Sequence, residues 1–299
     1  MSAQSQTAFV FAGGGSLGAI QVGMLKALLA HGIEADLVVG CSVGAINAAC
    51  FAGDPTPGGV ARLEAVWRGL RRSDVFPVPL LRSLMGLFSK RDHLVDPSPL
   101  RRLIDRNLSF ERLEETRLPC HVVATDLLEG IEVRIASGSV TQALLASAAI
   151  PGVFPPVRLD GRYLIDGGVA NHTPVSAAVE LGAKRVYVLP TGYSCTMETP
   201  PVRAIDVALH GLNILTVGKL VSAVQRFARD AEITVVPPLC PLATSPLDFR
   251  STGELIDRAA LETENWLANG VELTVDGLPH QFLPHSHRGD GDPYAARTL

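Results

Sequence analysis

The chain has no hydrophobic run long enough to suggest a membrane span. One long stretch without a charged residue, from Ile135 to Val157, is interrupted by one glutamine and three prolines. A spanning helix needs about 20 predominantly apolar residues in succession, so we expect no transmembrane segment. The first cation is Lys26, which leaves no basic segment of the kind that opens a secretory signal. We therefore expect a cytoplasmic protein.

Cysteine, aromatic residues and excess positive charge are also scarce. The five cysteines are odd in number and lack the spacing of metal ligands, which predicts neither a disulfide framework nor a metal site. The net charge of −4 gives no footprint for nucleic acid. Aromatic residues make up 5% of a chain that is 47% hydrophobic, which is typical of the aliphatic core of a buried parallel sheet. We expect no cofactor, and the composition indicates no particular oligomeric state.

One serine stands between glycines at a predicted turn from a strand into a helix. The apolar residues 37–39 precede Gly40-Cys41-Ser42-Val43-Gly44, and the small residues 45–49 follow. In this context Gly-x-Ser-x-Gly is typical of a nucleophile elbow, although a flexible turn is the alternative. A serine on such an elbow takes strained backbone angles, and side chains two residues to either side would collide.

A second glycine cluster, Gly13-Gly14-Gly15-Ser16-Leu17-Gly18, follows the apolar run 8–12 and precedes a helical pattern over 19–30. Successive glycines leave backbone N–H groups bare at the helix start, where they can hold a phosphate or an oxyanion. Gly13, Gly15 and Gly18 also fit the dinucleotide-binding pattern G-x-G-x-x-G. That function needs an acidic residue at the end of the second strand, whereas Glu34 and Asp36 precede that strand. The pattern therefore disfavours nucleotide binding.

The third motif is Asp166, which follows the apolar strand 163–165 and precedes Gly167 and Gly168. Open α/β sheets place functional groups at such strand ends. The carboxylate could accept the serine proton as a general base. It could equally cap a turn, as Asp-Gly pairs commonly do.

These three motifs, in this order, resemble the patatin-like phospholipase family. The segments 124–126 and 146–156 are also similar to that family, and the resemblance covers about residues 7–190. It implies a serine–aspartate dyad that hydrolyses lipid esters, with Ser42 as nucleophile and Asp166 as base. It also implies that the N–H groups of Gly14, Gly15 and Val43 hold the oxyanion. One departure is Leu17, which stands where many members carry Arg or Lys.

Two other functions remain open at this stage. An acyltransferase would use the same residues but pass the acyl group to an acceptor other than water, and a regulatory module would keep the fold without catalysis. A histidine base would have to follow the acid in the chain, and His172 is the serious candidate because His210 falls inside a helical pattern. The remaining histidines after Asp166 lie in the tail: His280, His285 and His287. A turn residue hydrogen-bonded to backbone is the more ordinary role for His172.

Strands alternate with helices along the rest of the chain. We predict strands over 120–125, 131–135, 184–189 and 231–236, and helices over 140–149, 202–228 and 252–269. This alternation predicts a three-layer α/β/α fold with a mostly parallel central sheet. No Gly/Ser linker separates the motifs, so we expect one domain over residues 7–278 and a disordered tail over 279–299.

Residues 61–106 differ in charge from the rest of the chain. They carry ten Lys and Arg against five Asp and Glu, a net of +5. Within them, the apolar run Val75–Phe88 is flanked by basic residues. One interpretation is a lid or a peripheral membrane contact through residues 75–91. The other is an inserted helical hairpin that packs on the sheet and exposes a basic rim.

Overall fold

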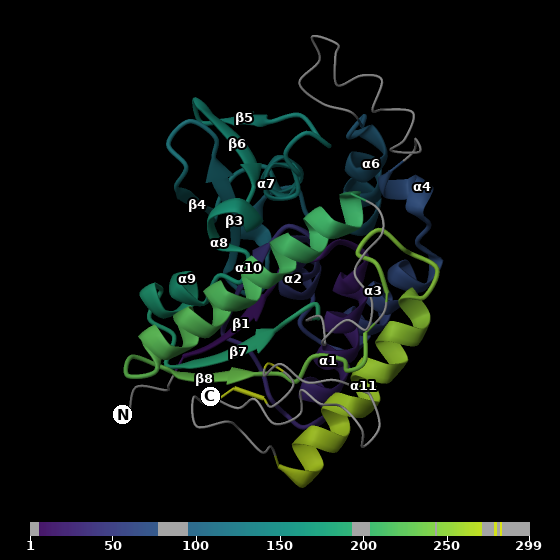
Figure 1. Ribbon diagram of the computed structural model, residues 1–299, viewed down its shortest axis with the longest axis vertical. Coiled ribbons are helices and arrows are strands. Elements are labelled where there is room, and N and C mark those ends of the chain that lie inside the picture. The colour runs from purple at the N-terminus through teal and green to yellow at the C-terminus, as the bar shows by residue number, and fades with distance from the viewer. Residues whose placement is uncertain are drawn as a thin grey trace.

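The computed structural model describes residues 6–76, 95–192, 204–242, 244–270, 278–279 and 282. Its centre is one mixed sheet in the order β5-β6-β3-β2-β1-β7-β8, with β4 paired to β3. In Figure 1 the sheet extends from β8 near the bottom to β5 at the top. The strands are β1 (Thr7–Phe11), β2 (Leu37–Cys41), β3 (Cys120–Asp126), β4 (Glu132–Ile135), β5 (Val157–Leu159), β6 (Arg162–Asp166), β7 (Arg185–Leu189) and β8 (Glu232–Val235).

Five neighbouring strands of the sheet run parallel to one another: β3, β2, β1, β7 and β8. Strands β4 and β6 pair antiparallel with β3, and β5 pairs antiparallel with β6. Both faces of the parallel part are buried, because alternate residues of each strand belong to different hydrophobic clusters. On β1, Phe9 and Phe11 belong to one cluster, and Ala8 and Val10 belong to the other. This explains why the strand reads as an uninterrupted apolar run.

Helices cover the two faces of the sheet and make the fold three-layered (Figure 1). The face of Phe9 and Phe11 carries the larger cluster, and α1 and α11 pack side by side there. Its helices are α1 (Ala19–Ala30), α2 (Val43–Gly53), α3 (Pro57–Gly69), α6 (Ser98–Asn107), α7 (Val140–Ser147) and α11 (Thr252–Asn269). The opposite face carries α9 (Val175–Glu180) and α10 (Ala204–Phe227), and α10 crosses in front of the sheet in Figure 1.

The predicted three-layer architecture is confirmed, and two helices, α1 and α11, have the predicted bounds. The sequence analysis did not predict the three-residue strand β5 or the short helices α8 (Gly168–Asn171) and α9. These elements span too few residues to show a clear periodicity. Within the described residues, no helix combines the length and the apolar character needed to cross a membrane.

The described parts of the basic segment are helical. Helix α3 packs against α1, α2 and α11 rather than directly on the sheet, and the short helix α4 (Arg72–Val75) packs against α6. Phe76, which the sequence analysis placed in a possible membrane contact, is buried and stacks on Phe154 with ring centroids 5.6 Å apart. Residues 77–91 of that predicted contact lie outside the described residues, as does most of the predicted tail.

Candidate active site

Ser42 occupies the turn between β2 and α2 and has a strained backbone. Its φ is 54° and its ψ is −127°, and only Ser42 and Asp160 among the described non-glycine residues have positive φ. A left-handed conformation of this kind costs about 1–3 kcal/mol in a non-glycine residue. The backbone N–H of Ser42 donates to Ser147 Oγ at 2.8 Å, and Ser147 Oγ donates to the carbonyl of Val123 at 2.6 Å. A side chain on α7 therefore holds the turn in place.

The flanking glycines allow helix α2 to start directly above the strand. A Cβ on Gly40 would lie 2.5 Å from the carbonyl oxygen of Gly44, and a Cβ on Gly44 would lie 2.4 Å from the carbonyl oxygens of Phe11 and Ala12. No side chain fits at either position. A side chain at Gly40 or Gly44 would therefore collide with the backbone, as the sequence analysis expected.

Asp166 is in direct contact with the serine. The Ser42 hydroxyl donates to Asp166 Oδ2 at 2.6 Å, and the N–H of Gly168 donates to Asp166 Oδ1 at 2.7 Å. Burial raises the pKa of Asp166 to about 6, although these two hydrogen bonds favour the ionised form and act against the rise. At neutral pH the carboxylate is therefore largely ionised but closer to accepting a proton than an exposed aspartate.

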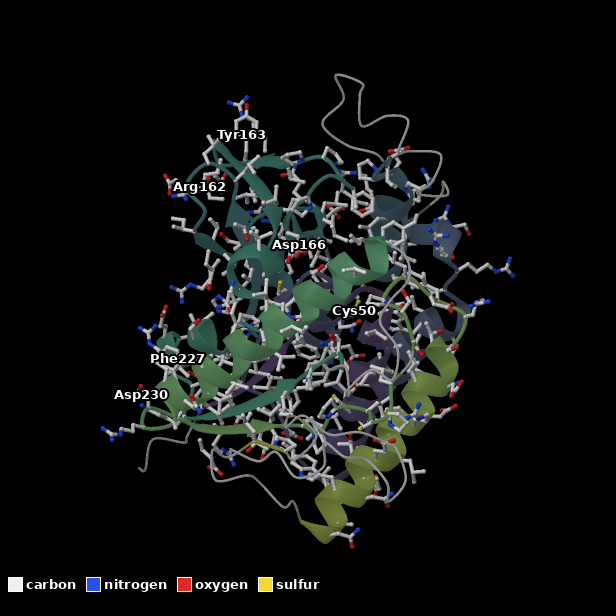
Figure 2. The ribbon with its side chains drawn as sticks, in the orientation of Figure 1. Cys50, Arg162, Tyr163, Asp166, Phe227 and Asp230 are labelled. Atoms are coloured by element: carbon white, nitrogen blue, oxygen red, sulfur yellow. The ribbon has the colours of Figure 1, made fainter. Side chains whose placement is uncertain are left out.

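Strand β3 explains how residues so distant in the sequence meet. Strand β2 pairs with β3 as far as Cys41 opposite Val123. Strand β6 pairs with β3 in the opposite direction and ends with Asp166 opposite Ala124. Because β4 occupies the other edge of β3 over the same residues, β2 and β6 share one edge and meet at their carboxyl ends. Figure 2 shows Asp166 deep in the molecule, whereas Arg162 and Tyr163 lie at the outer end of β6.

The glycine loop lies beside this pair. Gly14 and Gly15 have φ of 151° and 60°, and a Cβ on Gly15 would lie 2.4 Å from the carbonyl oxygen of Pro246. Three of the loop's N–H groups have acceptors: that of Gly13 donates to the carbonyl of His172, that of Ser16 to the carbonyl of Pro246, and that of Leu17 to the carbonyl of Gly14. Among the described residues, the N–H groups of Gly14 and Gly15 have no acceptor.

Val43 supplies a third N–H at the start of α2, where the first turn of a helix has no acceptor of its own. Gly15, Ser42 and Val43 line the same cavity. These three N–H groups are the ones that the sequence analysis expected to hold an oxyanion.

Buried polar side chains that the sequence analysis did not single out fix the two ends of the glycine loop. Gln21 Nε2 donates to the carbonyls of Ala12 and Leu189, at 2.8 and 2.9 Å. Asn47 Nδ2 donates to the carbonyl of Gly18 at 2.9 Å and to Gln21 Oε1 at 2.8 Å. Both side chains lie on buried faces of mainly apolar helices. A polar residue at a position where the pattern predicts a core residue was the signal that could have identified Gln21 and Asn47.

The cavity beside Ser42 has a volume of about 460 Å³ and is mainly apolar. It extends between α2, α3 and α6, from Ser42 at one end to Gly53 and Asp54 at the other. Helix α2, which spans this interval, is about 16 Å long at 1.5 Å per helical residue. Cys50, labelled in Figure 2, is one of its lining residues. Its apolar wall includes Ile46, Leu63, Trp67, Leu103, Ile104 and Phe154.

Three other residues from the sequence analysis have structural environments that do not involve the Ser42–Asp166 contact. Asp36 accepts the N–H of Thr7 at 2.7 Å, at the end of the sheet opposite the glycine loop. Asp126 accepts the N–H groups of Leu128 and Glu129 in the turn after β3. Cys41 is buried, and burial raises the pKa of its thiol well above the usual range. The thiol therefore stays protonated next to Ser42.

Among the histidines that the structure describes, only His172 lies at the site. Its carbonyl accepts the N–H of Gly13 at 3.1 Å, as the turn interpretation expected, but its ring also lies beside Gly13. The side chain of His210 and the tail histidines lie outside the described residues.

The chain is thus an α/β protein with a Gly-x-Ser-x-Gly turn at the carboxyl end of a parallel strand and a buried aspartate in contact with the serine. A family model described as patatin-like phospholipase matches residues 9–179. The chain belongs to the patatin-like phospholipase family.

Two relatives match about two thirds of the chain. Patatin-like phospholipase domain-containing protein 6 of Mus musculus is 30% identical over 188 residues, which cover 62% of this chain and 13% of that protein. Lysophospholipase NTE1 of Scheffersomyces stipitis is 27% identical over 191 residues, covering 64% of this chain and 12% of that protein. The chain therefore spans about an eighth of the length of these relatives. The crystal structure of VipD from Legionella pneumophila aligns with a TM-score of 0.49 and 15% identity, over 88% of this chain and 68% of that chain.

Proposed function

We propose that the protein is a serine acyl-ester hydrolase that acts on lipid esters. The observation that carries this proposal is the hydrogen bond of 2.6 Å between Ser42 Oγ and Asp166 Oδ2 at one end of a long apolar cavity. Two relatives are named as a phospholipase-domain protein and a lysophospholipase, which supports a lipid ester as substrate. The expectation of a cytoplasmic protein that contacts membranes peripherally is part of this proposal.

In the proposed reaction, Ser42 Oγ attacks the ester carbonyl carbon while Asp166 takes its proton. The carbonyl oxygen becomes an oxyanion that accepts hydrogen bonds from Gly14, Gly15 and Val43. The carbon–oxygen bond to the alcohol then breaks, and the proton on Asp166 passes to the leaving oxygen. Water hydrolyses the acyl-serine by the same steps in reverse, with Asp166 again as base.

The cavity accounts for the acyl part of the substrate. Its apolar walls gain favourable free energy by burying a hydrocarbon chain, at about 25 cal/mol per Å². The ring of Phe110, which a Cβ on Gly53 would approach to 2.5 Å, lines the cavity near the end of α2. We propose that one fatty acyl chain lies along α2 with its carbonyl at Ser42 and its methyl end near Phe110.

The first test is covalent labelling with a fluorophosphonate, which reacts with an activated serine. We expect the wild type to be labelled and Ser42→Ala not to be labelled. Cys41→Ala is the matched control: it removes the neighbouring nucleophile, and we expect it to be labelled like the wild type. Labelling that persists in Ser42→Ala would contradict the assignment of the nucleophile.

The second test identifies the products from mixed micelles of phosphatidylcholine or lysophosphatidylcholine, with and without an added alcohol. Release of free fatty acid in the absence of the alcohol supports hydrolysis. Products found only as esters of the added alcohol would make the protein an acyltransferase instead. No product from either lipid, together with no labelling, would indicate the non-catalytic module.

A further inference from the structure

The ring of His172 lies between Gly13 of the glycine loop and Gly168 of the Asp166-Gly167-Gly168 motif. A Cβ on Gly13 would lie 3.1 Å from His172 Nε2 and 3.4 Å from Ser42 Cβ. A Cβ on Gly168 would lie 3.3 Å from His172 Cδ2 and 3.0 Å from Asp166 Oδ1. The Nε2–Cδ2 edge of the imidazole therefore fills a slot that exists because both positions lack a side chain, and this slot adjoins both Ser42 and Asp166.

Among the described residues, one ring nitrogen of His172 has no hydrogen-bond partner. His172 Nδ1 lies 3.4 Å from Thr173 Oγ1, and among the described residues Nε2 has no hydrogen-bond partner. Burial, together with the nearby cation of Lys219, lowers the pKa of His172 to about 4. The imidazole is therefore neutral at pH 7. When Thr173 Oγ1 donates to Nδ1, the single ring proton is on Nε2 and available to a ligand.

The slot adjoins the serine but is not part of the lining of the apolar cavity. Gly15, Ser42 and Val43 line the cavity, whereas Gly13, Gly168 and His172 are not among its lining residues. An ester with its acyl chain in the cavity and its carbonyl at Ser42 must direct its alcohol part away from the cavity. His172 Nε2 is a polar group that lies beside the glycine loop and outside the lining of the cavity.

We propose that His172 donates a hydrogen bond from Nε2 to the alcohol oxygen of the ester as that oxygen leaves. This inference rests on the proposed hydrolase function. The bond between the carbonyl carbon and the alcohol oxygen breaks, and Asp166 returns to the alcohol the proton it took from Ser42. His172 keeps its own proton throughout. It stabilises the negative charge that develops on the leaving oxygen before that proton arrives.

The test compares two esters with the same acyl group, ethyl hexanoate and 4-nitrophenyl hexanoate. Ethoxide is a strongly basic leaving group that needs hydrogen bonding, whereas 4-nitrophenolate is a weak base that leaves without much help. We expect His172→Leu to lower kcat/KM for the ethyl ester by about 10²-fold, the usual effect of losing one such donor. The loss for the nitrophenyl ester should be roughly tenfold or less, because charge on its oxygen is already delocalised.

The ratio of the two kcat/KM values is the decisive quantity, because any loss of folded enzyme affects both esters equally and cancels. His172→Asn keeps an N–H donor, and we expect its ratio to lie closer to that of the wild type. His121→Leu is the matched control, since it removes a half-buried histidine from β3 outside the site, and its ratio should equal that of the wild type. An equal loss on both esters in His172→Leu overturns the proposal.

Failure of the proposed function gives a different result. In that case the wild type hydrolyses neither ester faster than Ser42→Ala does, and both inferences fall together. If the wild type hydrolyses both esters and Ser42→Ala neither, only the ratio in His172→Leu decides the role of the histidine.

Discussion

The two turns that form the site follow neighbouring parallel strands and lead into helices, yet they are built in opposite ways. The turn after β2 exposes a side chain, and its central residue, Ser42, has φ 54°. The turn after β1 exposes backbone N–H groups, and its positive-φ positions are Gly14 and Gly15. A reacting side chain thus requires a strained non-glycine residue, whereas backbone donors require residues without side chains. The following predictions test this division.

The largest effect is expected at the strained serine itself. We expect Ser42→Ala and Ser42→Gly both to lose 10⁴-fold or more in ester hydrolysis, the usual result of deleting a nucleophile. Glycine accepts a positive φ that alanine does not, so Ser42→Gly should be about 1 kcal/mol more stable than Ser42→Ala. Urea unfolding of the two variants measures this difference. Equal stabilities would show that the elbow stores no strain.

The next effect concerns the base that serves the serine. Asp166→Asn keeps the shape of the side chain but cannot accept the proton, and we expect a loss of about 10³-fold in kcat. His172→Asn should lose roughly tenfold or less, since its amide still donates and the histidine is not the base. Steady-state kinetics on one ester compares the variants. If His172→Asn is as inactive as Ser42→Ala and still folded, a histidine base replaces the dyad.

At the glycine loop, a single methyl group should displace the backbone donors. Gly15→Ala places a Cβ 2.4 Å from the carbonyl oxygen of Pro246, and we expect a loss of about 10²-fold in turnover as the donors move. Gly32→Ala is the matched control: its φ of 71° gives a similar backbone penalty, but a Cβ there meets nothing within 4 Å. Both variants should lose stability, and only Gly15→Ala should lose activity. Equal activity in the two would remove the loop from the mechanism.

The smallest effect is the dependence on pH. Asp166 must be ionised to act as base and has a pKa of about 6, so kcat/KM should fall about tenfold per pH unit below pH 6 and level off above it. A profile that stays level to pH 4 would contradict a base with this pKa.

The same shift affects stability with the opposite sign. The unfolded chain releases this proton near pH 3.8, whereas the folded protein holds it to about 6, so Asp166 contributes less to stability as the pH rises through this interval. We expect Asp166→Asn to raise the thermal midpoint at pH 7 by a few degrees. A lower midpoint at pH 7 than in the wild type would mean that the hydrogen bonds of the carboxylate outweigh its burial.

Local patterns predicted the parts of the site, but not how they are supported. The elbow, the glycine loop and Asp166 could be found because glycine and serine at fixed spacings reflect local backbone geometry. Ser147 could not be found in this way, since its hydrogen bond to the N–H of Ser42 connects residues 105 positions apart. The ring of His172 could not be placed either, because the slot between Gly13 and Gly168 forms only when β1 and β6 lie in the same sheet.

The fold was also predictable from local patterns, and only where no long-range contact decided the outcome. Parallel strands such as β1 and β2 are apolar throughout, and helices such as α11 have a clear apolar face and a terminal glycine. The basic segment was harder to interpret, because apolar residues in it can face either a membrane or the core. For Phe76 the choice depends on a tertiary contact with Phe154, which no local pattern contains.

The end-to-end arrangement of β2 and β6 on one edge of β3 gives the site an unusual tolerance to change in length. Ser42 and Asp166 are 124 positions apart in the chain, yet a single peptide step, from Val123 to Ala124, sets their spacing. Residues added or removed in the loops between them leave that step unaltered. The chain can therefore acquire new connecting segments, and with them new substrate preferences, while the nucleophile and its base stay in register.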